Sequence, residues 1–427
     1  MATKAVAVIS NKDSMEEFLV LAREAGYEVC GIVYLRRFTR YGISEDKARE
    51  IRSLMERCGA ESVIFDTQLK PRHLFNISKE LGIEPKDRIE IILEIFKAHS
   101  PSKEADLQIK LASLQYELAR ARERVRIRRM GEQPGITSGL GEYEVDIYYN
   151  EIKRNIQSIK RKLLEERRRR DIHRMSREKK GFKTISITGY YSSGKTTLFN
   201  ALTGAMCPVG PEPFTTLSTK FSTIWIGPWK CYLVDTIGFI SDLPPFMIMA
   251  FYSTLEEIKF SDLVLLVIDV SEDYDIIKRK LVTSLDILKK LEYDGKIIAV
   301  GNKVDLLNNR EDVLKPIKSL IVEYIDDVVF TSSKYGWGID KLVAKIKSAL
   351  GNIISIRVSL PYGDGVYEAI DFLKRFSNNV NPVYTDNGVT VECEIDEENL
   401  ESIKNYIEKR GGKVIGHINI KAIPQDY

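Results

Sequence analysis

The sequence has no run of about 18 consecutive apolar residues, the length that a helix needs to cross a bilayer. Its first residues, Met1–Lys4, do not lead into the apolar segment and cleavage site of a signal peptide. Both absences argue against membrane insertion and secretion. We therefore expect a cytoplasmic protein with no stable membrane insertion.

Cysteine and histidine are scarce and scattered. The 427 residues include 5 cysteines and 4 histidines. No two cysteines have the CxxC spacing and the histidines show no metal-binding pattern, so neither a disulfide scaffold nor a zinc site is indicated. We interpret the cysteines as reduced, mostly buried side chains.

The chain as a whole has no large excess of positive or negative charge, but one segment is strongly basic. The formal net charge is only +3, whereas residues 151–180 hold 13 basic and 5 acidic side chains, including Arg167–Arg170. Such a run commonly forms a solvated helix face with ion pairs one turn apart. Because the acids are too few to pair with the bases, a polyanionic partner is a competing explanation. No aromatic residues alternate with the bases, which favours phosphate contact over base reading.

The hydrophobic pattern divides the chain into four parts. Residues 1–100 alternate apolar strands with helical segments but lack a glycine-rich phosphate loop, so we predict a small α/β domain without assigned chemistry. Residues 101–181 have a different, helical pattern. Residues 182–350 predict an α/β domain with a doubly wound, mostly parallel sheet. Residues 353–427 contain an Asn-Gly hairpin signal and predict a small α+β domain.

Residues 101–181 predict an antiparallel coiled-coil hairpin. Two segments carry apolar residues at alternating spacings of four and three, and a Gly/Pro-rich stretch separates them. The first seam comprises Leu107, Leu111, Leu114, Leu118, Ala121 and Val125. The second comprises Ile152, Ile156, Ile159 and Leu163.

A phosphate-binding loop stands out at Gly189–Thr196. The stretch fits the GxxxxGK[ST] pattern, follows a predicted strand and opens a predicted helix, which is the context that this motif requires. The glycines let the backbone N–H groups face the β-phosphate at a helix N-terminus. Lys195 would place its cation on the β- and γ-phosphate oxygens, and Thr196 would supply a hydroxyl ligand for Mg²⁺.

A second motif, DxxG, lies at Asp235–Gly238, directly after the predicted strand Cys231–Val234. The Asp235 carboxylate could hold Mg²⁺ through a water molecule, and the Gly238 N–H could reach the γ-phosphate. This motif is common by chance. Its place about forty residues beyond the phosphate loop makes the pair specific.

A third motif, NKxD, selects the base. In Asn302–Asp305, the Asp305 carboxylate can accept hydrogen bonds from guanine N1–H and N2–H₂, a donor pair that adenine lacks. Asn302 would support the phosphate loop, and Lys303 would lay its methylenes along the base. Ser332–Lys334 follows another strand and is similar to the SAK motif that contacts the guanine oxygen, but has Ser333 in place of alanine.

Two features of the switch regions follow from the spacing. The threonine that closes over the γ-phosphate must lie between the first two motifs, and Thr215, Thr216 and Thr219 are all candidates. Phe239 occupies the position after Gly238, where many GTPases have a glutamine that orients the attacking water. A phenyl ring cannot hydrogen-bond water, so we expect slow intrinsic hydrolysis or a water positioned by another group.

Together with their surroundings, these motifs resemble the HflX-type GTPases. The most specific resemblance is to that family's switch II signature: Asp235–Ile240, Leu243-Pro244, Ala250-Phe251 and Ser253–Glu257. Further resemblances lie in Asp87-Arg88, residues 91–96, Lys103–Ala105, Leu107-Gln108, Leu111-Ala112, Leu114 and Leu360–Tyr362. They extend over nearly the whole chain.

The resemblance implies a partner and a second metal ligand. Phe214–Thr216 corresponds to the family's switch I, with Thr216 as a magnesium ligand, and a hydrophobic residue such as Phe239 replaces the catalytic glutamine. Family members bind the large ribosomal subunit, which stimulates hydrolysis, and several are implicated in splitting stalled ribosomes. Ribosomal RNA would then be the partner of the basic hairpin. Its tip, Ser138–Glu142, departs from the family's basic-Gly-Pro-Gly-Glu pattern.

The combined prediction is a monomeric, Mg²⁺-dependent GTPase that binds GTP and GDP. Its expected catalytic residues are Lys195, Thr216 and Gly238, and its expected magnesium ligands are Thr196, Thr216 and Asp235. The expected GTP-binding residues are Gly189, Tyr190, Tyr191, Ser192, Ser193, Gly194, Lys195, Thr196, Thr197, Phe214, Thr215, Thr216, Asp235, Gly238, Asn302, Lys303, Asp305, Ser332, Ser333 and Lys334.

Two alternatives remain at this point. The hairpin could be a general anionic anchor, which would make the protein a GTPase that acts on another RNA or at an anionic membrane surface. A metabolic P-loop enzyme such as a nucleotide kinase is a third class. Asn302–Asp305 argues against that class, because guanine selection serves switches more than metabolism.

Overall fold

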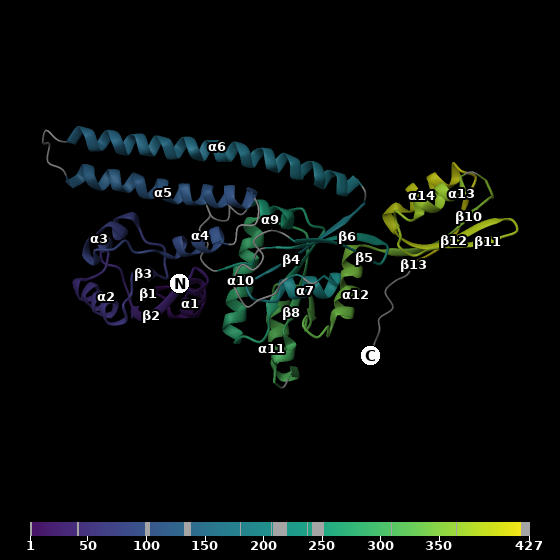
Figure 1. The fold of residues 1–427 in the computed structure, drawn as a ribbon. Helices are drawn as coiled ribbons and strands as arrows, with labels where there is room; N and C mark the ends of the chain where they lie inside the picture. The colour runs from purple at the N-terminus through teal and green to yellow at the C-terminus, as the bar shows by residue number, and fades with distance from the viewer. Residues whose placement is uncertain are drawn as a thin grey trace. The chain divides into compact units, whose positions relative to one another are not determined.

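A computed structural model of the chain describes residues 2–40, 42–98, 103–131, 138–179, 181–205, 207, 220–236, 238–240, 252–308, 310–363 and 365–419. The described residues form two compact units (Figure 1). The first contains the described residues up to Arg168, and the second contains most of those from Arg169 onward.

The first unit begins with a small parallel sheet in the order β2-β1-β3. Its strands are β1 (Thr3–Ile9), β2 (Tyr27–Tyr34) and β3 (Ser62–Phe65). Its helices are α1 (Met15–Glu24), α2 (Glu45–Cys58), α3 (Pro71–Leu81) and α4 (Arg88–Ala98), and a 3₁₀ turn, η1 (Lys12–Ser14), precedes α1. Local chemistry sets the ends of α2, because Ser44 caps its first turn and Gly59 follows it with φ 65°.

The helical hairpin consists of α5 (Lys103–Gly131) and α6 (Ser138–Lys179). Residues of both predicted seams pack in one apolar cluster: Leu111, Leu114, Leu118, Ile152, Ile156, Ile159 and Leu163. Polar contacts join α5 to α4. The Tyr116 hydroxyl donates to the Asp87 carboxylate, and Arg120 Nη1 lies 2.5 Å from Glu90 Oε1. Burial raises the pKa of Asp87, although the Tyr116 hydrogen bond opposes this shift.

The second unit is built on a six-stranded sheet in the order β5-β6-β4-β7-β8-β9, in which only β5 runs antiparallel to its neighbour. Its strands are β4 (Lys183–Gly189), β5 (Lys220–Ile226), β6 (Trp229–Asp235), β7 (Leu263–Asp269), β8 (Lys296–Asn302) and β9 (Asp327–Phe330). Its helices are α7 (Lys195–Thr203), α9 (Tyr252–Lys259), α10 (Tyr274–Lys290), α11 (Arg310–Val322) and α12 (Ile339–Leu350), with a 3₁₀ turn, η2 (Val304–Leu306).

Helices cover both faces of this sheet. Leu198 and Phe199 of α7 and Leu342 and Ile346 of α12 share one core with the buried side chains of the central strands. Helix α10 lies on the opposite face (Figure 1). The predicted α/β fold with a doubly wound, mostly parallel sheet is therefore confirmed, and the sheet directs the carboxyl ends of β4, β6, β7 and β8 toward one edge.

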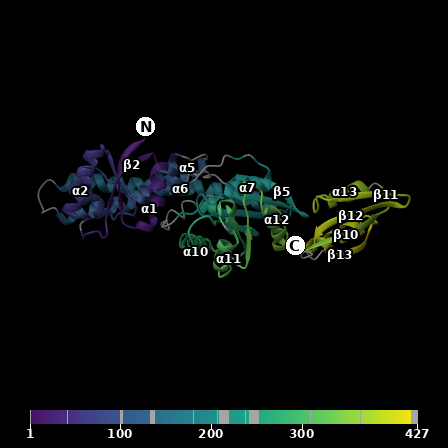
Figure 2. The ribbon, with the colours of Figure 1, turned by 90° about the horizontal axis from the view of Figure 1, so that it is seen from below.

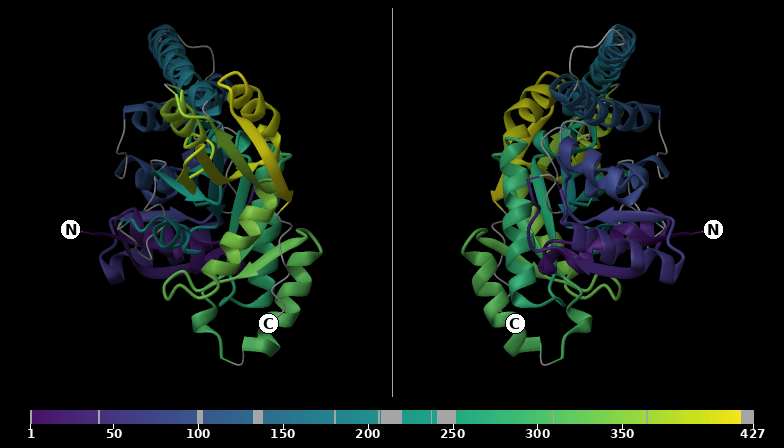
Figure 3. Two further views of the ribbon diagram at one scale, coloured as in Figure 1. Left: turned by 90° about the vertical axis from the view of Figure 1, so that its right-hand side faces the viewer. Right: turned by 90° about the vertical axis from the view of Figure 1, so that its left-hand side faces the viewer.

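The chain ends in a four-stranded antiparallel sheet in the order β11-β12-β10-β13. Its elements are β10 (Ile353–Leu360), α13 (Val366–Leu373), β11 (Val380–Thr385), β12 (Gly388–Asp396), η3 (Glu397–Asn399), α14 (Leu400–Glu408) and β13 (Lys413–Asn419). Both helices pack on one face of the sheet (Figures 2 and 3). The hairpin expected from the Asn-Gly signal is formed by β11 and β12, but its two-residue turn is Asp386-Asn387, one residue earlier than Asn387-Gly388, because Gly388 already pairs with Thr385.

Candidate nucleotide-binding site

The described residues of the three predicted motifs lie at the carboxyl ends of β4, β6 and β8, and Ser332–Lys334 lies just beyond β9. Phe214, Thr215 and Thr216 lie outside the described residues, as does Thr219, the other switch I candidate. Leu243-Pro244 and Ala250-Phe251 of the switch II resemblance lie outside them too.

The phosphate loop requires glycine at both of its ends. Gly189 has φ 140°, and a Cβ atom there would lie 2.2 Å from the Val267 carbonyl oxygen. Gly194 has φ 92° and precedes the first residue of α7, and a Cβ there would lie 2.3 Å from Asn302 Nδ2. Between them Ser192 also adopts a positive φ of 58°. These conformations bend the chain from β4 into the N-terminus of α7, a site that favours anions.

Asn302 connects the loops around the site through its buried side-chain amide. Its Nδ2 donates to the Ser193 carbonyl at 2.9 Å. Its Oδ1 accepts from the Ser333 backbone N–H at 3.0 Å and from the Ser333 hydroxyl at 2.8 Å. The serine that replaces alanine in the SAK-like motif therefore adds a hydrogen bond to the same network.

Lys195 is buried at the start of α7, and its Nζ donates to the Tyr190 carbonyl at 2.8 Å. Burial lowers the pKa of Lys195 to about 8, the Asp235 carboxylate opposes this shift, and Lys303 adds to it. Burial thus disfavours the charged form of Lys195. An anion bound in the loop would favour that form.

Thr196 and Asp235 bring two oxygen donors together. The Thr196 hydroxyl donates to Asp235 Oδ2 at 2.8 Å, and both side chains are buried. Hydroxyl and carboxylate oxygens are the ligands that Mg²⁺ prefers, so this donor set fits the ion. Among the residues that the structure describes, no group of three or more His, Cys, Asp or Glu side chains could hold a metal without other ligands.

The DxxG segment contacts the phosphate loop through its backbone. The Tyr191 N–H donates to the Phe239 carbonyl at 2.9 Å, and the Phe239 N–H donates to the Gly189 carbonyl at 3.0 Å. A Cβ on Gly238 would lie 2.8 Å from Tyr191 Cα and 2.9 Å from Lys195 Nζ. Glycine is therefore required at 238 for close packing. The Phe239 side chain is 2% exposed, so in this conformation it belongs to the core.

The predicted base-binding residues Asp305 and Lys303 are held by two neighbouring side chains, of which only Asp269 lies outside the sequence motifs. Asp305 Oδ1 accepts from the Ser332 hydroxyl at 2.6 Å. Lys303 has φ 69°, and its Nζ lies 2.6 Å from Asp269 Oδ2 at the end of β7. Asp269 was missed by sequence reasoning, although its position at the end of a buried apolar strand beside Asn302 was available as a signal.

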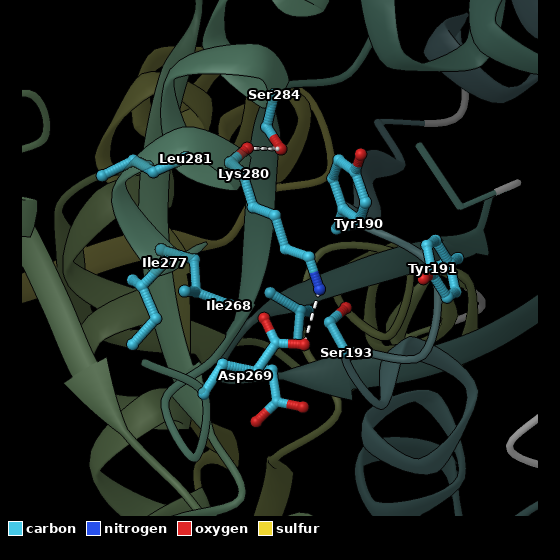
Figure 4. Close-up of a pocket in the computed structure, with 11 residues that line it drawn as sticks. Tyr190, Tyr191, Ser193, Ile268, Asp269, Ile277, Lys280, Leu281 and Ser284 are labelled. Carbon is cyan, nitrogen blue, oxygen red and sulfur yellow. Dashed lines mark hydrogen bonds and ion pairs between the residues drawn. The ribbon is translucent and has the colours of Figure 1, made fainter. Parts of the chain in front are cut away.

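Lys280 of α10 is a second residue that sequence reasoning missed. It lines a pocket beside the phosphate loop, where its Nζ lies 4.9 Å from the Tyr190 ring centroid and 5.4 Å from that of Tyr191 (Figure 4). It also lies 2.5 Å from Glu272 Oε1. The ammonium group thus fixes two aromatic side chains of the loop by cation–π contacts. Its position on a helix remote in sequence left no motif to detect.

The fold and these loops define a P-loop GTPase, and comparison with known proteins agrees. Residues 184–303 match the family described as "50S ribosome-binding GTPase", residues 12–97 match "GTP-binding GTPase N-terminal" and residues 99–177 match "GTP-binding GTPase Middle Region". The chain belongs to the HflX family of GTPases. It therefore binds guanine nucleotides and hydrolyses GTP, and the resemblance inferred from the sequence is confirmed.

Similar proteins include two curated relatives and one solved structure. GTPase HflX of Methanocaldococcus jannaschii is 42% identical over 333 residues, which cover 78% of this chain and 82% of the relative. GTPase HflX of Hyperthermus butylicus is 40% identical over 348 residues, which cover 79% and 92%. A GTP-binding protein from Sulfolobus solfataricus, solved in complex with GDP, is 32% identical with a TM-score of 0.44, and the match covers 82% of this chain and 99% of that one.

Proposed function

We propose that this GTPase is a switch that binds the large ribosomal subunit through its basic hairpin and is stimulated there to hydrolyse GTP. The observation that carries the proposal is the exposed basic surface of α6. Its exposed bases between Lys153 and Arg169 are Lys153, Arg154, Lys160, Arg161, Lys162, Arg167, Arg168 and Arg169. A helix that presents this many cations suits a phosphate backbone such as that of ribosomal RNA.

The nucleotide site would act as follows. The N–H groups of Gly189–Thr197 surround the phosphates, and Lys195 regains its charge against them. Thr196 and Asp235 would hold Mg²⁺, which would supply neutralising charge to the phosphates, and Thr216 is the proposed third protein ligand. Gly238 offers its N–H to the γ-phosphate.

Guanine would be selected at the other end of the site. Asp305 accepts both donors of the base edge while Ser332 donates to its Oδ1, which fixes the plane of the carboxylate. Lys303, held by Asp269, lies beside the base, and the Ser332–Lys334 backbone faces the guanine oxygen. Adenine lacks the donor pair and would leave the carboxylate unsatisfied.

Slow intrinsic turnover follows from Phe239. Its ring is in the core and its backbone pairs with the phosphate loop, so it does not orient a water molecule in this conformation. We propose that ribosome binding supplies or positions the missing group. On this proposal the chain acts in the cytoplasm as a monomer, in ribosome splitting, rescue or assembly.

The test combines a rate and a pelleting assay with purified large ribosomal subunits. GTP turnover should rise strongly when subunits are added, and the protein should co-sediment with them in the presence of a non-hydrolysable GTP analogue but not GDP. Equal binding to unrelated RNA, or to vesicles of anionic phospholipid, would instead favour a general anionic anchor and contradict the proposal.

A further inference from the structure

Helix α6 continues past its exposed basic surface and contacts α9 at Arg170. Helix α9 (Tyr252–Lys259) is the first described helix after the DxxG segment, and it contains Ser253–Glu257, part of the switch II resemblance. The contact between these two helices therefore joins the proposed ribosome-binding helix to the segment that follows Gly238.

One residue of the basic run faces this contact. Arg170 Nη2 lies 3.1 Å from Glu256 Oε2. The Glu256 side chain is 3% exposed and that of Arg170 is 24% exposed, whereas Arg167, Arg168 and Arg169 are exposed. A buried carboxylate needs such a partner, because removing the guanidinium would leave a desolvated charge. Arg170 thus differs from its three exposed neighbours in facing a buried carboxylate.

A second contact lies one turn further along α6. The Arg174 guanidinium lies 3.6 Å from the ring centroid of Phe260, just beyond the end of α9, and its Nη2 lies 2.7 Å from Asp171 Oδ1. An arginine stacked this closely on an aromatic ring has a defined orientation. Two contacts at consecutive turns fix the last part of α6 on α9.

Helix α9 is in turn fastened to the strand that leads into the phosphate loop. The hydroxyls of Ser186 in β4 and Ser261 lie 2.6 Å apart, and Ser261 Oγ donates to the Glu257 carbonyl at 2.6 Å. The Thr184 N–H donates to Asp262 Oδ2 at 2.7 Å. A shift of α9 would therefore act on β4, which ends at Gly189 in the phosphate loop. The Gly189 carbonyl in turn accepts from the Phe239 N–H that follows the DxxG motif.

We propose that Arg170 and Glu256 are a positioning pair that transmits partner binding at α6 to the DxxG segment and so sets the stimulated rate of GTP hydrolysis. This inference rests on the proposed function, because it takes the large ribosomal subunit as the partner. Neither residue contacts nucleotide. The pair acts by holding α9 in one orientation relative to α6. When the large ribosomal subunit binds the exposed bases of α6, it changes the strain on the contact between Arg170 and Glu256.

The experiment compares wild type, Arg170→Gln, Glu256→Gln and the double variant, with Arg168→Gln as a matched control on the exposed side of α6. Large-subunit concentration is varied to separate the maximal stimulated rate from the concentration at half-stimulation. Pelleting gives subunit affinity, and GDP affinity and melting temperature report on folding. Glu256→Gln keeps the shape of the side chain and removes the buried charge, so it tests the pair even if Arg170→Gln is poorly folded.

Each single change in the pair should lower the maximal stimulated rate about 5- to 150-fold, the usual range for coupling between sites, with subunit affinity and GDP affinity nearly unchanged. The double variant should lose no more than either single one. Arg168→Gln should instead weaken subunit binding and leave the maximal rate intact. A wild-type maximal rate in folded Glu256→Gln would overturn the inference while leaving the proposed function standing. A wild-type protein that large subunits do not stimulate would overturn both.

Discussion

At the scale of single residues, the site depends on two charged side chains in different surroundings, Lys195 and Asp305. Lys195 is desolvated and has a lowered pKa, whereas Asp305 is held by one hydroxyl and keeps acceptor capacity for a ligand. Each residue therefore gives a prediction for nucleotide affinity.

GDP affinity should decline with pH because Lys195 must be protonated to hold phosphate. In the free protein its pKa is about 8, lowered from 10.5 by burial. Charged Lys195 therefore opposes folding below pH 8, and this penalty disappears as the pH rises from about 8 toward 10.5. Binding above pH 8 takes up one proton, so affinity should fall by about tenfold per pH unit.

Titration of GDP between pH 7 and pH 9.5 tests this slope. Lys195→Arg is the control, because its guanidinium does not deprotonate in this range and the base of GDP titrates equally in both proteins. An identical slope in the two proteins would show that another group takes up the proton.

Asp305→Ala should remove most of the guanine selectivity. Two charge-assisted hydrogen bonds contribute about 1.5–3 kcal/mol each, so the Kd for GDP should rise by about 10²- to 10⁴-fold. Ser332→Ala removes only the hydroxyl that orients the carboxylate and should cost about tenfold or less. Calorimetric titration with GDP and ADP measures both. A GDP Kd within threefold of wild type for Asp305→Ala would contradict the assignment of this residue.

At the scale of elements, the turn between β5 and β6 is attached to the end of β12. Trp229 Nε1 donates to Asp396 Oδ2 at 2.8 Å, and both side chains are 3% exposed. Lys183 Nζ lies 3.9 Å from the same carboxylate oxygen. The β5–β6 hairpin ends at Asp235, so this buried hydrogen bond ties the strand that positions the DxxG segment to the C-terminal sheet.

Trp229→Phe should lower the free energy of unfolding by about 1–3 kcal/mol, because it leaves a buried carboxylate without its indole donor. Chemical denaturation monitored by circular dichroism gives the value. Trp225→Phe, which removes an indole from the adjacent strand β5, is the matched control and should cost less. Equal losses in the two variants would mean that side-chain volume, and not the hydrogen bond, accounts for the effect.

Elements that carry a motif or a regular apolar period were predictable, and those defined by distant contacts were not. Strands β4, β6 and β8 are buried apolar runs followed by polar motif residues, and β7 is a buried apolar run, so these strands could be inferred from the sequence. Strand β5 (Lys220–Ile226) was missed because it is an edge strand, half exposed and without a motif.

The same difference between local patterns and distant contacts decides which parts of the nucleotide-binding site could be predicted. Gly189–Thr196 is a local pattern, whereas Lys280 reaches the loop from α10, and the Phe239 backbone pairing depends on two segments meeting in space.

At the scale of the whole molecule, α6 belongs to both compact units. Arg168 is the last residue of its part of the first unit and Arg169 the first of the second, and the helix is continuous across them. The exposed bases precede or reach this boundary, and Arg170 and Arg174 follow it. One helix thus carries a polyanion-binding surface in one part and an anchor to the GTPase domain in the other.

The salt dependence of subunit binding should report on the first of these parts. Neutralising Arg161 and Lys162, both exposed on α6, should reduce the slope of log K against log salt by about 1.4–1.8, because each phosphate contact contributes about 0.7–0.9. The control is Lys404→Gln/Lys409→Gln, a pair of exposed lysines in and just after α14. It changes the net charge equally but should leave the slope unchanged. If both pairs lowered the slope equally, general electrostatic attraction would explain binding, and α6 would lose its special role. A reduced slope confined to the α6 pair would place phosphate on the helix that Arg170 joins to switch II.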